Sequence, residues 1–152
     1  MLTQNMNTLR PIRRRPPHEI PSWVPDGSIY FITICAKERR GKPLLSSAAA
    51  TTRAAASYHE IGRWHLHLFL LMPDHVHLLA SFPVEPGLRR TVAAWKSYAA
   101  KKGGFRWQTD FFEHRLRADE SLDEKAHYIR MNPVRAGLCS KPGDWPHCWP
   151  EG

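Results

Sequence analysis

The sequence has little cysteine and no long apolar segment. Its three cysteines, Cys35, Cys139 and Cys148, are odd in number and scattered through 152 residues. A disulfide framework needs paired cysteines, so this set is typical of a reducing compartment. No apolar run approaches the roughly 20 residues of a membrane-spanning helix, and the N-terminal residues lack the apolar core of a secretory signal. We therefore expect a cytoplasmic protein without a membrane partner.

Acidic side chains are also in the minority. The chain has 22 Lys and Arg against 14 Asp and Glu, which gives a formal net charge of +8. A cytoplasmic protein this basic often binds a polyanion, and nucleic acid is the leading candidate. The alternative is a protein that is basic without having such a partner.

The chain has the length of one ordinary domain and shows no internal repeat. Its first residues are rich in proline, carry Arg13, Arg14 and Arg15 in succession, and lack a periodic apolar pattern. We expect a basic N-terminal arm at 1–28, one domain at 29–138 and a C-terminal tail at 139–152.

Apolar patterning predicts alternating strands and helices. Pro73-Asp74 is a turn between two apolar runs and predicts an antiparallel hairpin. Ser46 or Ser47 is placed to cap a helix, and Ser121 with Glu124 forms a capping box. We expect strands at 30–36, 64–72, 75–82 and, as a strand or an extended segment, 105–117; helices at 46–62, 86–104 and 121–132; and proline- and tryptophan-rich coil toward the end of the tail.

The expected order is β-α-β-β-α-β followed by one more helix. With antiparallel pairing this is an α+β fold, the split ferredoxin-like sheet with an extra C-terminal helix that carries Tyr128. This architecture serves many functions, so the function has to be argued from the site residues.

Two histidines interrupt the third apolar run. His75 and His77 are two residues apart, so on a strand their side chains point to the same face, as a metal chelate requires. The alternative is a pair of histidines on a solvated face, but the apolar flanks favour a buried strand, where an imidazole without a partner is costly. His65 and His67 form a second such pair, and a four-histidine zinc site would need a strand register that nothing in the sequence enforces.

A second candidate group lies some fifty residues later. Tyr128 and Asn132 are four residues apart on an expected helix and therefore share a face. An amide oxygen beside two imidazoles suits Mn²⁺ or Mg²⁺ better than a closed structural zinc. Taken singly, Tyr128 also fits a core aromatic residue, and Asn132, before a proline, also fits the end of a helix.

Together these motifs resemble a known family. MPDHVHLL, followed by YIRMNPVRAGL, is similar to the Y1 transposases of the HUH superfamily, above all to the REP-associated tyrosine transposases, relatives of the IS200-like enzymes. YFITICAKERR, WQTDFFEHRLR and DWPHCWP extend the resemblance over most of the chain, although His147 and Cys148 stand where the family commonly has serines.

The resemblance implies a chemistry for these residues. His75, His77 and Asn132 would bind a divalent metal, Mg²⁺ or Mn²⁺, and Tyr128 would be the nucleophile. The implied activity is metal-dependent nicking and strand transfer of single-stranded DNA through a covalent 5′-phosphotyrosine, at repeat DNA that carries a hairpin. A monomer is slightly favoured over a dimer, and the expected location is the nucleoid of a prokaryotic cytoplasm. No residue is assigned as the general base.

Basic side chains elsewhere are candidate DNA contacts. Lysines on the second helix lie near Trp95 and Tyr98, a mixture of charge and stacking surface that suits single strands, although any one of them also fits a solvated helix face. The candidates are Arg13, Arg14, Arg15, Lys96, Lys101, Lys102, Arg115, Arg117 and Arg135.

Two other functions remain open from the sequence. A domesticated protein would keep the affinity for DNA hairpins without catalysis, although the presence of both histidines with Tyr128 and Asn132 argues against it. A metal-dependent hydrolase would use the histidines and water, and would not need Tyr128.

Overall fold

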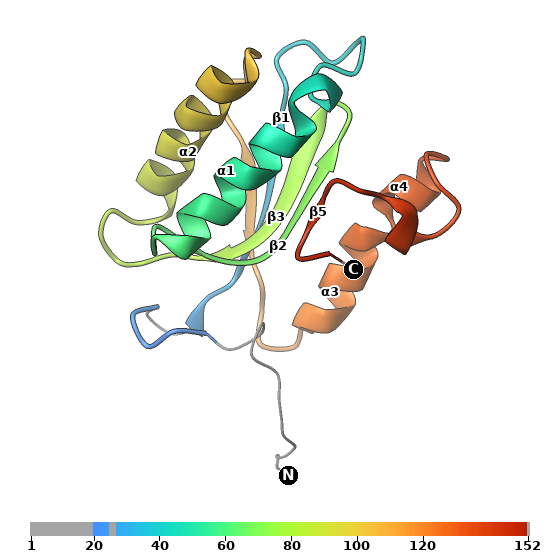
Figure 1. The fold of residues 1–152 in the computed structure, drawn as a ribbon. Coiled ribbons are helices and arrows are strands. Elements are labelled where there is room, and N and C mark those ends of the chain that lie inside the picture. The colour runs from blue at the N-terminus through green and yellow to red at the C-terminus, as the bar shows by residue number, and fades with distance from the viewer. Residues whose placement is uncertain (1–19, 25–26, 152) are drawn as a thin grey trace.

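The computed structural model describes residues 20–24 and 27–151 (Figure 1). The predicted contacts Arg13, Arg14 and Arg15 lie outside the described residues. In chain order the elements are β1 (Tyr30–Cys35), η3 (Leu45–Ser47), α1 (Ala48–Glu60), β2 (His65–Met72), β3 (His75–Ser81), α2 (Leu88–Gly103), β4 (Phe112–Arg115), α3 (Leu122–Arg130), α4 (Asn132–Arg135), η4 (Pro142–Asp144) and β5 (Cys148–Trp149).

The strands form one five-stranded antiparallel sheet in the order β4-β1-β3-β2-β5. The predicted β-α-β-β-α-β order of elements and the β2-β3 hairpin are confirmed. β3 lies in the middle of the sheet because β1 pairs with one of its edges and β2 with the other. Both edges of β3 are therefore covered along its length, which restricts its side chains to fixed positions on the two faces.

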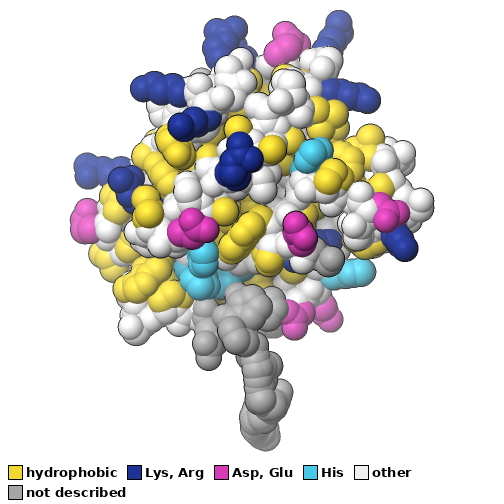
Figure 2. Space-filling view, viewed as in Figure 1, with side chains coloured by type: hydrophobic (Ala, Val, Ile, Leu, Met, Phe, Trp, Pro, Cys, Tyr) yellow, Lys and Arg dark blue, Asp and Glu magenta, His cyan; other side chains and the backbone are white. Residues whose placement is uncertain are grey.

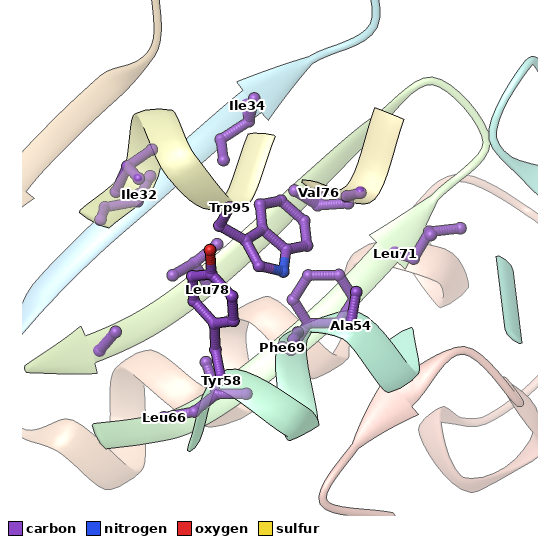
Figure 3. Packing of buried hydrophobic residues seen from close by; sticks show 14 of the residues in the cluster. Ile32, Ile34, Ala54, Tyr58, Leu66, Phe69, Leu71, Val76, Leu78 and Trp95 are labelled. Atoms are coloured by element: carbon purple, nitrogen blue, oxygen red, sulfur yellow. The ribbon is translucent and has the colours of Figure 1, made fainter. Parts of the chain in front are cut away.

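α1 and α2 cover one face of the sheet (Figure 1). The core beneath them contains Ile32 and Ile34 from β1 together with Val76 and Leu78 from β3. Trp95 of α2 is fully buried among these residues (Figure 3). The centroid of its ring lies 5.7 Å from that of Phe69 and 5.5 Å from that of Trp64. This cluster is the larger of the two cores, because two helices contribute to it and only one contributes to the other.

α3 and the C-terminal segment pack against the opposite face (Figure 1). Ile129 of α3 is fully buried against a strip of Leu68, Leu70 and Leu79. The C-terminal segment is attached by the Trp145 indole, whose Nε1 donates a hydrogen bond to the carbonyl oxygen of Leu71 at 2.9 Å. Both faces of the sheet are therefore covered, each by its own helices.

Two predicted segments differ from the structure. In 105–117 only Phe112–Arg115 is a strand, and Trp107 forms an isolated bridge with Ala36. In the tail the expected coil is wrong at Cys148–Trp149, which pairs with β2 as β5. Two residues carry no detectable period-2 pattern, so this strand exists only because the free edge of β2 lies beside it.

The predicted helices are confirmed with shifted ends. Ser47 is the residue before α1, but its side chain makes no capping hydrogen bond, whereas the Ser121 hydroxyl accepts a hydrogen bond from the Glu124 N–H at 3.2 Å. α3 ends at Arg130 and a separate turn, α4, starts at Asn132 with a proline in its first turn. Within residues 20–24 and 27–151, no helix has both the length and the hydropathy that crossing a bilayer would require.

The packing of Trp95 makes a prediction for stability. Trp95→Ala should lower the free energy of unfolding by about 3–5 kcal/mol, because the removed indole leaves a cavity among rigid aromatic neighbours. Urea unfolding followed by far-UV circular dichroism measures this loss. Val84→Ala, at a side chain that is 69 % exposed, is the control and should change stability by less than about 0.5 kcal/mol. An equal effect of the two substitutions would contradict the assigned packing.

Candidate active site

β3 presents His75 and His77 on the face of the sheet that α3 covers. Their neighbours Val76 and Leu78 belong to the core under α1 and α2, whereas Leu79 belongs to the core under α3. Because side chains alternate along a strand, the two imidazoles share the face of Leu79. The sequence prediction that the pair lies side by side on one face is confirmed by this register.

The two imidazoles converge through one nitrogen each. The Nε2 atoms of His75 and His77 are 3.1 Å apart. Each Nδ1 is held from the other side: that of His75 lies 2.7 Å from the Asp74 carboxylate, and that of His77 lies 2.9 Å from the Thr33 hydroxyl. An Nδ1–H donated by His75 to the carboxylate fixes the tautomer and leaves Nε2 as an acceptor, whose lone pair takes the hydrogen bond from Nε2–H of His77 here and is the lone pair that a cation would use.

Asp74, which sequence reasoning treated only as part of a turn, contacts the histidine pair through the Nδ1 of His75. Its carboxylate also accepts a hydrogen bond from Nε of Arg39 at 2.8 Å. Burial would raise the pKa of Asp74, but the hydrogen bonds from Arg39 and His75 outweigh it, and the pKa lies below its ordinary value. Asp74 is therefore ionised and orients the His75 ring. The sequence feature that could have indicated this contact is the position of Asp74 directly before His75.

His77 is kept neutral. Burial, followed by the charges of His75 and Arg135, lowers the pKa of His77 from 6.5 to about 3. A neutral imidazole is the form that coordinates metals. The ring of His77 also contacts that of Phe31, with 5.4 Å between ring centroids, so its orientation is set by packing as well as by Thr33.

The histidine pair fits a divalent cation. Two ligand nitrogens, each about 2.1 Å from a metal and at right angles, would lie about 3 Å apart, which agrees with the observed 3.1 Å. Within the part of the chain that the structure describes, no three side chains of the His, Cys, Asp and Glu types gather as a metal site. The third ligand that the resemblance implies, the amide of Asn132, is of another type.

Tyr128 lies on the exposed side of α3. Its side chain is 59 % exposed, whereas the next residue, Ile129, is fully buried. The adjacent positions on the helix point to opposite sides because each residue advances by about 100°. The alternative of a core tyrosine is thus wrong for Tyr128, whose ring is accessible to a large substrate.

Arg135 contacts both Tyr128 of α3 and Asn132 of α4. One guanidinium nitrogen, Nη2, donates to the Asn132 side-chain oxygen and to the Tyr128 carbonyl oxygen, both at 2.9 Å. The guanidinium carbon lies 4.1 Å from the centroid of the Tyr128 ring. The sequence pattern suggested only a phosphate contact for Arg135. Its local role depends on the turn at Asn132–Arg135, which brings it back over α3.

The surface beside Tyr128 is acidic on the N-terminal side of α3. A recess of about 280 Å³ is lined by Tyr128 together with Asp119, Glu120, Glu124 and Lys125, and the Lys125 ammonium lies 3.9 Å from Glu120. Arg135, in α4, lies beyond the C-terminal end of α3. The charge around the tyrosine ring is thus divided, with a net negative group of side chains on one side and a guanidinium on the other.

The other histidine pair belongs to the far end of the hairpin. His65 pairs with Ser81, whereas His75 pairs with Met72, and a bulge interrupts the β2 register at His67. The His67 Nε2 lies 3.1 Å from the Ser81 hydroxyl. The register therefore separates the two pairs along the hairpin, and a single four-histidine site does not form.

The predicted basic contacts lie in different surroundings. The Lys96 ammonium donates to the carbonyl oxygens of Gln108 and Thr109, both at 2.9 Å, and so holds the segment after α2. The Lys102 ammonium lies 5.6 Å from the Tyr98 ring centroid and lines an α1-α2 groove of about 340 Å³. Lys101 is exposed in the last turn of α2. Figure 2 shows Lys and Arg side chains gathered over the face on which α1 and α2 lie.

Arg115 and Arg117 lie at the other edge of the sheet. With Gly27, Glu120 and neighbouring residues they line a recess of about 260 Å³. The Arg117 backbone N–H donates to Glu120 at 2.7 Å, and Glu120 also lies 3.0 Å from Nε2 of His114. The guanidinium groups of both arginines are exposed and their role as DNA contacts stays a prediction.

Comparison with known proteins adds independent findings. No protein-family model matches the chain. It is 25% identical over 138 residues to a Haemophilus influenzae protein classed provisionally as a REP-associated tyrosine transposase, with 80% of this chain and 78% of that protein covered. It is 24% identical over 125 residues to the REP-associated tyrosine transposase of Escherichia coli, with 79% and 74% covered.

Solved structures agree on the fold. A REP-associated tyrosine transposase bound to a REP hairpin matches with a TM-score of 0.70 at 22% identity, over 86% of this chain and 81% of that one. A Deinococcus radiodurans protein, described provisionally as a transposase, matches with a TM-score of 0.51 at 19% identity, over 66% and 87%. The chain is therefore a homologue, at moderate identity, of the REP-associated tyrosine transposases.

Proposed function

We propose that this protein nicks single-stranded DNA and transfers the strand, with Tyr128 as nucleophile, at repeat DNA that carries a hairpin. The observation that carries the proposal is the convergence of the His75 and His77 Nε2 atoms. The two Nδ1 atoms are hydrogen-bonded to Asp74 and Thr33. The sequence relatives are tyrosine transposases, and one structural relative binds a REP hairpin. We assign the sheet to the split ferredoxin-like type with α3 as the added helix.

His75, His77 and Asn132 are the proposed ligands of Mg²⁺ or Mn²⁺. When bound, a divalent cation supplies Lewis-acid polarisation of a phosphate oxygen. The protein's own contribution is orientation: Asp74 and Thr33 fix the two rings, so that little conformational freedom is lost when a ligand is bound.

Tyr128 has the exposure that a nucleophile acting on a polymer needs. Its phenolic oxygen would lose its proton and form a bond to phosphorus, the bond from phosphorus to the 3′-oxygen would break, and the 3′-oxygen would take up one proton and leave as a hydroxyl, so that the step is neutral in protons. The energy of the broken phosphodiester is kept in the 5′-phosphotyrosine, so that a 3′-hydroxyl can reverse the step without another energy source.

The charge around Tyr128 supports a direction of approach. Three carboxylates and one ammonium, that of Lys125, line the recess on the N-terminal side of the tyrosine, and their net negative charge would repel a phosphate. Arg135 lies on the other side. We infer that the scissile phosphate enters from the side of Arg135 and β3, where the histidine pair also lies.

The remaining basic residues would bind DNA outside the reacting strand. Lys101 and Lys102 belong to α2, on the sheet face opposite α3. Arg115 and Arg117 lie along the β4 edge, close to where the described chain begins again at Gly27. Contacts to phosphates at these positions would add affinity that falls with salt but would not choose the cleaved bond.

The nucleophile gives the most direct prediction. Incubated with hairpin-bearing single-stranded DNA and Mn²⁺, the protein should form a covalent adduct that Tyr128→Phe abolishes, because phenylalanine lacks the attacking oxygen. Denaturing gel electrophoresis of labelled DNA measures the adduct. Tyr98→Phe, another exposed tyrosine, is the control and should keep the adduct. Strand cleavage that persists in Tyr128→Phe would indicate a hydrolase, and hairpin binding without cleavage would indicate a binding protein.

The hydrogen bond between Asp74 and His75 is expected to strengthen cation binding. Asp74→Asn should weaken Mn²⁺ binding about 10- to 100-fold, because the carboxylate that orients the ring and raises its basicity is lost. Electron paramagnetic resonance titration of free Mn²⁺ gives the dissociation constant without any turnover. Asp144→Asn, at an exposed carboxylate, is the matched control. Equal Mn²⁺ affinity in the two variants would remove Asp74 from the site.

His77 predicts a pH dependence of stability. Its folded pKa of about 3 lies below the ordinary 6.5, so between these values the unfolded chain binds a proton that the folded chain does not. The contribution of His77 to the free energy of unfolding is therefore complete above pH 6.5 and is lost as the pH falls toward 3. The free energy of unfolding then changes by at most about 1.4 kcal/mol per pH unit. Urea unfolding between pH 7 and pH 4.5 should show a shallower decline in His77→Gln than in the unsubstituted protein. Parallel declines would contradict the burial of a neutral His77.

A further inference from the structure

Arg135 contacts two groups that the proposed reaction would need, the Asn132 side-chain oxygen and the Tyr128 ring. Its Nη2 is bonded to the Asn132 side-chain oxygen, the atom proposed as third cation ligand, and its guanidinium covers the Tyr128 ring. The charge of Arg135 is also close enough to influence His77. A single positive group thus interacts with the proposed nucleophile, one proposed ligand and the surroundings of a second.

We propose that Arg135 is a two-position residue: before substrate binds it holds Asn132 and Tyr128, and when a divalent cation takes the Asn132 oxygen its guanidinium turns to the scissile phosphate. This inference rests on the proposed function. It assigns to Arg135 the orientation of the reacting phosphate beside Tyr128.

The donor geometry supports two alternative arrangements. One amide oxygen, already accepting a hydrogen bond from a cation, is a poor ligand for a second cation, since both charges seek the same lone pairs and repel each other. A divalent cation on the Nε2 pair therefore favours the departure of Arg135 from Asn132. A guanidinium with five donors then has free N–H groups, which match phosphate oxygens in pairs.

The side chain is free to make this movement. Arg135 is exposed and lies at the end of the short helix α4, and among the described residues its guanidinium donates to the Tyr128 carbonyl and the Asn132 amide oxygen and lies over the Tyr128 ring. Turning away therefore requires rotation about its own side-chain bonds, and the buried packing of Pro133 and Ile129 stays in place.

The first test measures Mn²⁺ alone, without DNA. Arg135→Gln should bind Mn²⁺ roughly 5-fold more tightly or better, because the competing hydrogen bond and a nearby positive charge are both removed. Arg130→Gln is the matched control: Arg130 is a nearby arginine on α3, but its Nη1 bonds to the Cys148 sulfur. Unchanged or weaker Mn²⁺ binding in Arg135→Gln, or equal tightening in Arg130→Gln, would overturn the proposal.

A double-mutant cycle separates competition from charge. In an Asn132→Ala background the oxygen in dispute is absent, so Arg135→Gln should tighten Mn²⁺ binding much less than it does alone. The same tightening in both backgrounds would mean that Arg135 acts only through its charge and would overturn the competition for Asn132.

The second test measures the rate of adduct formation on a hairpin substrate at saturating Mn²⁺. Arg135→Gln should slow it about 100-fold, because a charge-matched contact to the phosphate is lost. Arg135→Lys keeps the charge without the fork of donors and should recover part of this rate. Equal rates in the Gln and Lys variants would overturn the phosphate contact.

The two tests also separate this proposal from the proposed function. If the unsubstituted protein forms no adduct, the strand-transfer function fails, while the Mn²⁺ affinities still decide whether Arg135 competes with the cation. Urea unfolding of each variant verifies that it is folded at the temperature of the assay. Arg135→Met, which also lacks both the donors and the charge, serves in place of Arg135→Gln for the Mn²⁺ titration if the glutamine variant is unfolded, with tighter binding again expected and unchanged binding overturning the competition.

Discussion

The pairing of β3 with strands on both sides is the constraint on which the candidate site depends. β1 and β2 fix the register of β3, and the register decides that His75 and His77 share the face covered by α3. The same pairing places Thr33 opposite His77, where its hydroxyl holds the ring. A slip of one residue would turn both imidazoles into the core under α1 and α2. The geometry of the histidine pair is therefore only as well defined as the strand register.

The helix that carries Tyr128 is held by its opposite side. Ile129 fills the core under α3, and burying it leaves the neighbouring tyrosine exposed. The Arg135 guanidinium lies over the Tyr128 ring and also donates a hydrogen bond to the Asn132 side-chain oxygen. In this arrangement the apolar packing of Ile129 sets the position of the helix, while the polar contacts of Arg135 set the surroundings of the Tyr128 ring.

The regular elements could be predicted because each has a local signal. Apolar runs of period two and helix caps such as Ser121 are properties of neighbouring residues, and they gave the β-α-β-β-α-β order. β5 has only two residues, so no periodic pattern could reveal it. Its formation depends on the edge of β2, to which the Trp145 indole also binds. The break between α3 and α4 follows from Pro133, but where the chain turns afterwards depends on packing.

The sequence by itself determined that His75 and His77 lie side by side, because alternation on a strand is a local rule. It placed Tyr128 and Asn132 on one helix, whereas the structure divides them between α3 and α4. The sequence also carried the family motifs that the comparisons support. Only the tertiary structure decided the roles of Asp74, Thr33 and Arg135 in holding these groups. Their contacts cross between strands or around a helix end, and such contacts arise from the register and packing of the whole chain, which no single segment specifies.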